Sequence, residues 1–391
     1  METNRDKIIN VLTRGVDEVI DKDSLERKLL SGKKLRVKLG IDPTSPNIHV
    51  GRSIPLLKLK DFQELGHTVV FIIGDFTGTI GDTSDKESER PMLSKEIVDS
   101  NLKTYIDQAA KIIDIKRAEI YYNSEWLNSL NYRDVGRQAD VFSLNSFMMR
   151  DNIRRRLDGG KRVSLRELLY PLMQGYDSVK VKADVEVGGT DQKFNLLAGR
   201  DLQREYGQEP QDIVTNPLLE GLDGRKMSSS WGNTVNLLDI PNDMFGKIMS
   251  LKDEFIIRYF TFATRVSMDT INAYSDSLKY KSNPRDIKMN LAYELVRMYH
   301  SDDAAKKAQE FFVNTFTKKE LPSDIQEFTA IKFDLGSVLL DSKTVPSKSE
   351  MRRVLSQNGV KINGKTVTDH KTILNSGDIV QKGKLCVFRI R

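Results

Sequence analysis

The stretch from residue 35 to residue 75 constrains the fold most, because it predicts a strand, a helix and a second strand. Residues 35–39 alternate apolar and charged side chains, and apolar side chains recur at helical spacing over 53–65. Residues 67–75 are a nearly continuous apolar run that ends in Gly-Asp, as in a central parallel strand. Strand, helix and strand at this spacing form a βαβ unit. We therefore expect an α/β fold whose first domain is a doubly wound parallel sheet.

The loop between that first strand and the helix, residues 40–52, is punctuated by glycine and proline and carries His49. Ligands of doubly wound sheets bind at the ends of strands, and a helix N-terminus offers free N–H groups to a phosphate. Gly51 would let a nucleotide approach the backbone, and His49 could donate a hydrogen bond to a phosphate oxygen. Taken alone, the loop leaves a tight turn with an incidental surface histidine equally open.

The composition predicts a soluble globular protein, since 39% of the 391 residues are hydrophobic and 30% are charged. That length corresponds to two or three domains. No apolar run approaches the roughly 20 residues that span a bilayer, and no signal-peptide pattern opens the chain, so we expect a cytoplasmic protein without membrane contact. One cysteine, Cys386, and four scattered histidines predict neither disulfides nor a protein-bound metal.

The positive charge is concentrated in the C-terminal tail. Residues 346–391 hold ten lysines and arginines against three acidic residues, a net charge of +7, whereas the first 345 residues carry a net charge of −1. We expect a polyanionic partner for the tail only. The tail also matches G-x-x-x-x-G-K-T at 359–366, but these residues alternate as in a strand and no helix follows. We interpret the match as a hairpin turning at Asn363-Gly364, not as a phosphate-binding loop.

A predicted helix over 168–177 places Tyr170, Gln174 and Asp177 on one face among apolar neighbours. Convergent polar groups on an apolar wall are typical of small-molecule pockets, although ordinary polar contacts of a partly buried helix would give the same pattern. A strand within 183–192 then ends in a Gly-Gly turn.

The other predicted elements are mostly helical. They are one or two helices in 1–34, a helix over 95–113, a helix over 140–157, a helix over 193–206 and mostly helix from 241 to 337. The predicted helix over 140–157 ends in the basic run 154–156, which we interpret as a solvated face that could also meet RNA phosphate. The polar segment 224–230 is expected to be mobile.

Two short motifs make the chain resemble the class I aminoacyl-tRNA synthetases. His49-Val50-Gly51-Arg52 stands where that class carries His-Ile-Gly-His, and Lys226-Met227-Ser228-Ser229-Ser230 stands for Lys-Met-Ser-Lys-Ser. Tyr170, Gln174 and Asp177, with Gly-Gly-Thr-Asp-Gln at 188–192, are similar to the bacterial tyrosyl-tRNA synthetases. The basic tail resembles the small RNA-binding module, shared with a ribosomal protein, that closes many of them.

This resemblance implies a fold, a reaction and its partners. The reaction is tyrosine–tRNA ligation, in which ATP converts L-tyrosine to tyrosyl-adenylate and pyrophosphate, and tyrosine then passes to the 3′ end of tRNA(Tyr). Mg²⁺ would accompany ATP, held largely by phosphate oxygens. A homodimer is also implied. The implied parts are a Rossmann-like catalytic domain (1–225), the signature loop with an α-helical tRNA anticodon-side domain (226–337), a linker (338–345) and a small α+β RNA-binding domain (346–391).

The resemblance also assigns site residues. The implied catalytic residues are Thr44, His49, Arg52 and Lys226. Further ATP contacts would come from Asp42, Gly51, Asp191, Gln192, Met227, Ser228 and Ser229. Tyrosine would be bound by Asp82, Tyr170, Gln174, Asp177 and Gln192, with Asp177 accepting from the phenol hydroxyl. Lys86 and Arg90 would reach the pyrophosphate.

Three residues depart from the family pattern. Arg52 replaces the second histidine of the first signature and remains a donor. Ser229 replaces the second lysine of the later signature and removes a cation. Lys38 stands where many family members place a tyrosine that contacts the substrate hydroxyl, which would shift discrimination onto Asp177.

Three alternatives remain open. A tryptophanyl-tRNA synthetase has the same fold and signatures but less use for the polar face around Asp177. A small-molecule nucleotidyltransferase shares the His-x-Gly loop but would not explain the basic tail. A non-catalytic RNA-binding relative would account for the departures at Arg52 and Ser229.

Overall fold

The computed structural model describes residues 1–84, 91–280, 283–318, 326–342, 344–345, 347–383 and 386–391. The chain forms two compact units. The first consists of Met1–Asp239 and Leu251–Leu291, and the second of Ile240–Ser250 and Ala292–Arg391. Among the described residues, none of the helices combines the length and apolar character that crossing a bilayer requires.

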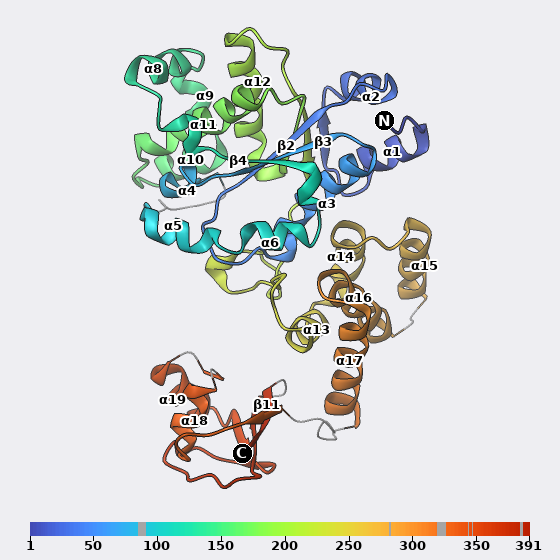
Figure 1. Cartoon of the computed structure of the whole chain (residues 1–391), viewed down its shortest axis with the longest axis vertical. Coiled ribbons are helices and arrows are strands. Elements are labelled where there is room, and N and C mark those ends of the chain that lie inside the picture. The colour runs from blue at the N-terminus through green and yellow to red at the C-terminus, as the bar shows by residue number, and fades with distance from the viewer. Residues whose placement is uncertain (85–90, 281–282, 319–325, 343, 346, 384–385) are drawn as a thin grey trace. The chain divides into compact units, whose positions relative to one another are not determined.

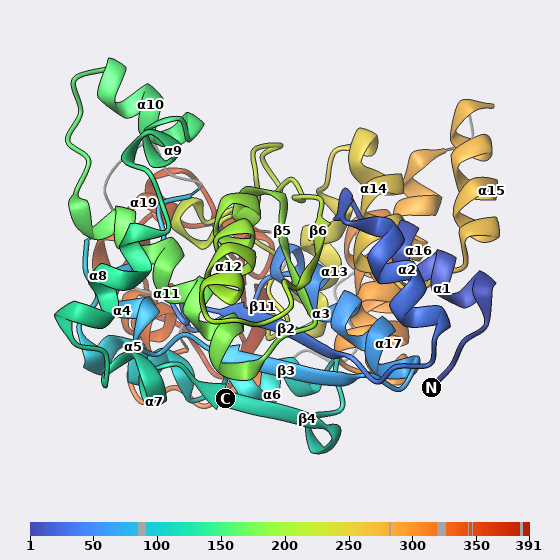
Figure 2. The same ribbon diagram turned by 90° about the horizontal axis from the view of Figure 1, so that it is seen from above.

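A six-stranded sheet forms the centre of the first unit, and its strands lie side by side in Figure 2. Its strands are β1 (Glu18–Ile20), β2 (Arg36–Ile41), β3 (Thr68–Ile73), β4 (Ala118–Tyr122), β5 (Val185–Gly189) and β6 (Asp212–Asn216). Their order is β1-β6-β5-β2-β3-β4, and neighbours are parallel except the edge pair β1 and β6. The chain leaves β2 toward β3 and β4, and later continues from β5 to β6 on the other side. The switch point between β2 and β5 is where doubly wound sheets bind ligands.

Helices cover both faces of this sheet, as the sequence predicts (Figure 1). On one face lie α3 (Val50–Glu64) and α6 (Tyr105–Ala110), and on the other lie α11 (Leu165–Val181) and α12 (Lys193–Glu205). The side chains of Val69 to Ile73 on β3 are completely buried, which explains why this strand is apolar at every position.

Two long helices predicted from the sequence are interrupted. Residues 95–113 form α5 (Lys95–Leu102) and α6, and residues 140–157 fall within α8 (Tyr132–Asp140), α9 (Leu144–Met148) and α10 (Asp151–Asp158). The second interruption has a local cause, because the Ser143 side chain accepts the N–H of Ser146 and begins a new helix there.

The sequence analysis predicted neither β1 nor its partner β6. The N-terminal helices are present as α1 (Arg5–Thr13) and α2 (Lys22–Leu30), but β1 lies between them. β1 is three residues long and pairs with β6, whose existence the sequence analysis also missed. Pairing between segments so distant in sequence leaves no local periodic signal in a strand of three residues.

Helices make up most of the segment from 241 to 318, as expected. They are α13 (Pro241–Met249), α14 (Ile256–Ala263), α15 (Met268–Lys279), α16 (Pro284–Tyr299) and α17 (Asp302–Phe312). Within the second unit α13 packs on α17, with the rings of Phe245 and Phe312 5.5 Å apart.

The C-terminal residues form a second sheet of order β7-β11-β10-β8-β9 with two helices. Its elements are β7 (Gln326–Phe328), α18 (Leu335–Asp341), α19 (Lys348–Ser356), β8 (Val360–Ile362), β9 (Lys365–Thr366), β10 (Ile379–Lys382) and β11 (Cys386–Ile390). β8 and β9 are antiparallel, and Asn363 and Gly364 between them both have positive φ, at 49° and 80°. The match at 359–366 is therefore a hairpin, as predicted.

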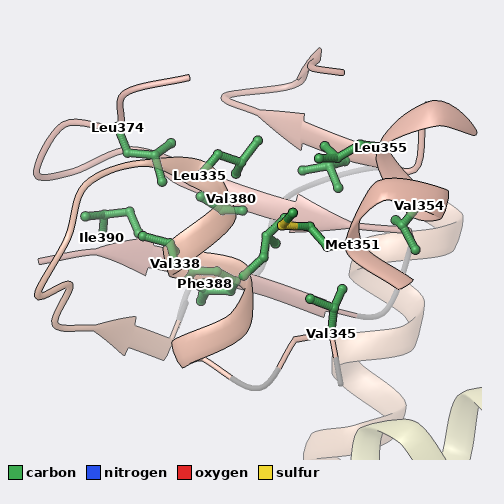
Figure 3. Packing of buried hydrophobic residues seen from close by; sticks show 12 residues of the cluster. Leu335, Val338, Val345, Met351, Val354, Leu355, Leu374, Val380, Phe388 and Ile390 are labelled. Carbon is green, nitrogen blue, oxygen red and sulfur yellow. The ribbon is translucent and has the colours of Figure 1, made fainter. Parts of the chain in front are cut away.

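The core of this C-terminal region includes residues that the sequence places in a linker. Val338, Leu339 and Val345 are buried against Met351 and Phe388 (Figure 3). A boundary at residue 346, which lies outside the described residues, would divide this core.

Candidate active site

The sequence-predicted site residues that the structure describes all line one pocket at the switch point between β2 and β5. These residues are Asp42, Thr44, His49, Gly51, Arg52, Asp82, Tyr170, Gln174, Asp177, Asp191, Gln192, Lys226, Met227, Ser228 and Ser229. Lys86 and Arg90 lie outside the described residues. Because contributions come from β2, α3, α11 and the turn after β5, the fold itself brings these distant segments together.

His49 is the N-cap of α3, and its Nδ1 accepts the N–H of Arg52 at 3.3 Å. Burial, together with the nearby charges of Arg52 and Lys226, lowers the pKa of His49 to about 3. The imidazole is therefore neutral at physiological pH. Since Nδ1 accepts, the proton resides on Nε2, which makes His49 a hydrogen-bond donor rather than a cation.

The two signature segments are held against each other. The N–H of Val50 donates to the carbonyl of Val235 at 2.8 Å, and the N–H of Gly51 contacts the Met227 sulfur at 3.3 Å. A Cβ at position 51 would lie 3.2 Å from the His49 ring and 3.5 Å from that sulfur. Glycine therefore permits the close approach of the Met227 loop to the start of α3.

Arg52 lies on the first turn of α3 and is anchored by two hydroxyl groups. Its guanidinium donates to Thr44 Oγ1 at 3.2 Å and to the Tyr105 hydroxyl at 3.3 Å. Tyr105 belongs to α6, so the helix interrupted near residue 104 supports the site. Gln108 on the same helix accepts the N–H of Ile48 at 2.7 Å and thereby fixes the loop before His49.

Lys226 forms an ion pair with Asp191 at 2.8 Å in this structure. Asp191 follows β5 in a short 3₁₀ turn, and a Cβ at Gly189 would lie 2.5 Å from its carboxylate. The Lys226 segment was predicted to be mobile. In the structure Asn233 supports it, accepting the N–H of Ser228 at 2.9 Å and donating to the carbonyl of Lys226 at 3.1 Å.

Asp177 brings an almost completely buried carboxylate to the pocket. It accepts from Trp126 Nε1 at 2.8 Å and from Asn123 Nδ2 at 3.2 Å. Burial raises the pKa of Asp177 to about 7, although Lys38 and these two donors oppose the shift. Sequence reasoning missed both Trp126 and Asn123, since they follow β4 without a local motif.

Asp42, at the end of β2, is held by two hydroxyl donors. Thr77 Oγ1 donates to it at 2.7 Å and the Tyr170 hydroxyl at 2.9 Å. A Cβ at Gly74 would lie only 2.0 Å from the Asp42 carboxylate, so β3 must be followed by glycine for this arrangement to form. Burial and then the proximity of Asp42 raise the pKa of Tyr170, which keeps its hydroxyl protonated as a donor.

Asp82 and Gln192 come from separate segments and meet at the pocket wall. Gln192 Nε2 donates to Asp82 at 2.7 Å, and the Ser84 hydroxyl donates to the same aspartate at 2.6 Å. This turn is tied down by a buried ion pair between Arg156 and Glu167, whose carboxylate also accepts from Thr83 at 2.7 Å. Arg156 was predicted to lie on a solvated helix face; it is buried instead, because it faces the start of α11.

Comparison with known proteins identifies the family. A model described as "tRNA synthetases class I (W and Y)" matches residues 30–317, and one described as "S4 domain" matches residues 337–380. The first match covers most of the chain. The chain belongs to the class I tRNA synthetases of the W and Y family.

Relatives of this synthetase match it over almost its whole length. A tyrosine–tRNA ligase of Thermotoga maritima is 45% identical over 98% of this chain and 96% of the relative. A tyrosine–tRNA ligase of Haemophilus influenzae is 42% identical over 100% of this chain and 98% of the relative.

Solved structures have the same fold. The Archaeoglobus fulgidus tyrosyl-tRNA synthetase with L-tyrosine has a TM-score of 0.63 and 24% identity, covering 78% of this chain and 99% of that one. The C-terminally truncated mitochondrial tyrosyl-tRNA synthetase of Aspergillus nidulans has a TM-score of 0.66 and 22% identity, covering 79% of this chain and 94% of that one.

The departure at Lys38 has a structural explanation in this synthetase. Lys38 is fully buried and pairs with Glu186 at 2.8 Å, and neither residue is among those that line the pocket. The groups that stand beside Asp177 are Asn123 and Trp126. Sequence reasoning identified the position of Lys38 as unusual but did not predict its partner.

Proposed function

We propose that this synthetase is a tyrosine–tRNA ligase, which converts L-tyrosine and ATP to tyrosyl-adenylate and pyrophosphate and then transfers tyrosine to the 3′ end of tRNA(Tyr). The observation that carries this conclusion is the full-length match, at 42–46% identity, to relatives of that name. The buried carboxylate of Asp177 at the end of the pocket is consistent with recognition of a phenol hydroxyl, which donates a hydrogen bond.

The amino acid would occupy the inner part of the pocket. Asp177 would accept from the phenol hydroxyl, with Asn123 beside it. Asp82, Tyr170 and Gln174 would hold the ammonium group, for which Asp82 supplies the negative charge. Gln192, hydrogen-bonded to Asp82, would lie near the carboxylate and the ribose of the adenylate.

ATP would occupy the outer part, where the donors gather. The tyrosine carboxylate attacks the α-phosphate and pyrophosphate leaves, so catalysis requires alignment and stabilisation of the charge that develops on the phosphate oxygens. His49 would donate from Nε2, and Arg52 and Lys226 would supply positive charge. Gly51 leaves backbone space for the nucleotide, Thr44 orients Arg52, and Met227, Ser228 and Ser229 border the phosphates. Lys86 and Arg90 are proposed for the pyrophosphate by family resemblance.

Lys226 must exchange partners during this step. Its ion pair with Asp191 would have to open for the Lys226 ammonium group to reach a phosphate. The carboxylate of Asp191 would then be released near the adenylate, on the side where Asp42 also lines the pocket. Mg²⁺ would enter with ATP as part of the substrate, bound by phosphate oxygens.

The basic C-terminal region is proposed to bind tRNA. Because α18 is part of its core, the module would begin before residue 335 and not at 346. Removing residues 326–391, which include β7, should leave tyrosine-dependent ATP–pyrophosphate exchange intact, weaken aminoacylation of tRNA(Tyr) and reduce its dependence on salt. Loss of exchange in this truncated protein would contradict the proposed division.

We also propose a homodimer in the cytoplasm. The segment from α9 to the start of α11 exposes large apolar side chains, among them Leu144, Met149 and Leu165 with 61%, 67% and 77% of their surface exposed. Burying them against a second copy would remove this surface from water. Light scattering should give twice the mass of one chain, and a monomer at micromolar concentration would overturn the assignment.

The decisive assay for the reaction is amino-acid-dependent ATP–pyrophosphate exchange. Tyrosine should support exchange, and tryptophan should not. Exchange with tryptophan alone would favour a tryptophanyl-tRNA synthetase. Exchange with another substrate would favour a small-molecule nucleotidyltransferase. The absence of exchange with any amino acid would favour a non-catalytic RNA-binding relative.

A further inference from the structure

The ion pair of Lys38 and Glu186 lies directly behind the amino-acid end of the pocket. The two residues face each other across β2 and β5, at the switch point of the sheet. Lys38 has none of its surface exposed and Glu186 has 1%. Such a pair contributes little net stability, because the loss of hydration offsets the attraction between the charges. A contribution to stability therefore does not explain why the chain buries this ion pair.

The contacts of this ion pair converge on Gln174. The Lys38 ammonium donates to the backbone carbonyl of Gln174 at 2.9 Å, to Ser178 Oγ at 2.8 Å and to the Glu186 carboxylate at 2.8 Å. Each of its three protons therefore has an acceptor. Glu186 in turn accepts from the Gln174 side chain at 3.2 Å and from Ser178 at 3.0 Å. Gln211 Nε2 also donates to Glu186.

This network determines which end of the Gln174 amide faces the pocket. An ionised carboxylate only accepts hydrogen bonds, so the NH₂ group of Gln174 must face Glu186. The carbonyl oxygen of the same amide then faces away from Glu186, and Gln174 lines the pocket. An ammonium group only donates, so it requires an acceptor such as this oxygen.

We propose that the Lys38–Glu186 pair is a positioning device that holds the carbonyl oxygen of Gln174 toward the pocket and so selects ligands that carry an ammonium group. Lys38 takes no part in contacting the substrate hydroxyl. Its role is to pair with Glu186 and to bind the Gln174 backbone carbonyl. This inference rests on the proposed function, in which Gln174 binds the tyrosine ammonium.

The test compares two variants that differ only at Lys38. Lys38 and the Gln174 side chain both donate to the same oxygen of Glu186, Oε1. In Glu186→Gln, the Lys38 ammonium still requires an acceptor, so the new amide keeps its oxygen at that position. That oxygen also accepts from Gln174, whose orientation is therefore retained. In the double variant Lys38→Met/Glu186→Gln, the new amide is free to turn its NH₂ group toward Gln174, which then turns its own NH₂ group toward the pocket. Both changes are nearly isosteric, and thermal melts verify folding.

Binding is measured by titration calorimetry with three ligands. L-Tyrosine and tyramine carry the ammonium group, and 3-(4-hydroxyphenyl)propanoate lacks it. We expect the double variant to bind the first two about tenfold more weakly than Glu186→Gln does, as for loss of one charge-assisted hydrogen bond, and the third within twofold. Gln211→Leu, which removes a donor to Glu186 that does not touch Gln174, should bind all three as the unaltered chain does.

Two results would overturn the inference: unchanged tyrosine and tyramine affinity in the double variant, or an equal loss for all three ligands. If the double variant does not fold, Lys38→Met/Glu186→Leu replaces it, because an apolar pair removes the buried charge and leaves the same expectation. Failure of the proposed function is distinguishable, since the unaltered chain would then show no tyrosine-dependent exchange.

Discussion

The inner and outer ends of the pocket are built in different ways. At the inner end, Trp126 holds Asp177 and Glu186 holds Gln174. Neither Trp126 nor Glu186 is among the residues that line the pocket. At the outer end, His49 and Arg52 lie on the first turn of α3, and Lys226 lies on a loop with its charge paired to Asp191. The inner end is fixed before any ligand arrives, whereas the outer end has a contact that a ligand must replace.

This difference indicates a division of labour. A fixed, desolvated acceptor discriminates between ligands, because a ligand that lacks the matching donor leaves a buried polar group unpaired. Donors and cations near the phosphates act on charge that develops during the reaction. Changes at the inner end should therefore alter which amino acid is used, and changes at the outer end should alter how fast it reacts.

The largest expected effect is that of Asp177→Ala. Sites built to bind a substrate hydroxyl reject the analogue lacking it by about 10⁴–10⁵, a range for which tyrosyl-tRNA synthetases against phenylalanine are themselves the standard example. Most of the preference for tyrosine over phenylalanine should be lost, measured as the ratio of kcat/KM in pyrophosphate exchange. A retained preference would show that another group reads the hydroxyl.

Lys226→Ala should produce the next largest effect. Loss of a positive charge near the reacting phosphate should lower kcat for exchange by about 10²–10³, while the KM for tyrosine stays within twofold. The matched control is Arg225→Ala, which removes a neighbouring exposed cation that stacks on Trp231, 4.7 Å from its ring centre. Similar losses in both variants would contradict a specific role for Lys226.

The effect of pH on tyrosine binding is expected to be smaller. With a pKa of about 7, Asp177 is ionised above neutral pH and becomes protonated below it. In the proposed complex the phenol hydroxyl donates to the ionised form, so the dissociation constant should rise as pH falls below 7, by up to about tenfold per unit. His49, with a pKa of about 3, stays neutral throughout. The dependence should disappear in Asp177→Asn, and its persistence there would assign the titration to another group.

Local sequence patterns predicted much of this molecule correctly. The apolar periods located β2, α3 and β3, and the Asn363-Gly364 pair located the hairpin, because these features depend on a few neighbouring residues. Helix interruptions and the pairing of β1 with β6 were not predictable in this way. Ser143 begins a new helix by accepting the N–H of Ser146, and β1 exists because β6 lies beside it.

The site shows the same limit. The two signatures and the polar face of α11 identified the residues that line the pocket, but not the residues that hold them. Glu186, Trp126 and Tyr105 come from separate elements and have no motif, so only the tertiary structure relates them to Gln174, Asp177 and Arg52. Lys38 was recognised as a departure, yet its buried partner depends on the pairing of β2 with β5.

The most direct test of the division between the two ends is tyrosine binding measured without ATP. Titration calorimetry would be carried out on the unaltered chain, on Asp177→Ala and on Lys226→Ala. We predict that Asp177→Ala binds tyrosine about 100-fold more weakly, as expected for loss of a hydrogen bond to a charged group, and that Lys226→Ala binds it within twofold of the unaltered chain. Equal losses of affinity in the two variants would contradict the account.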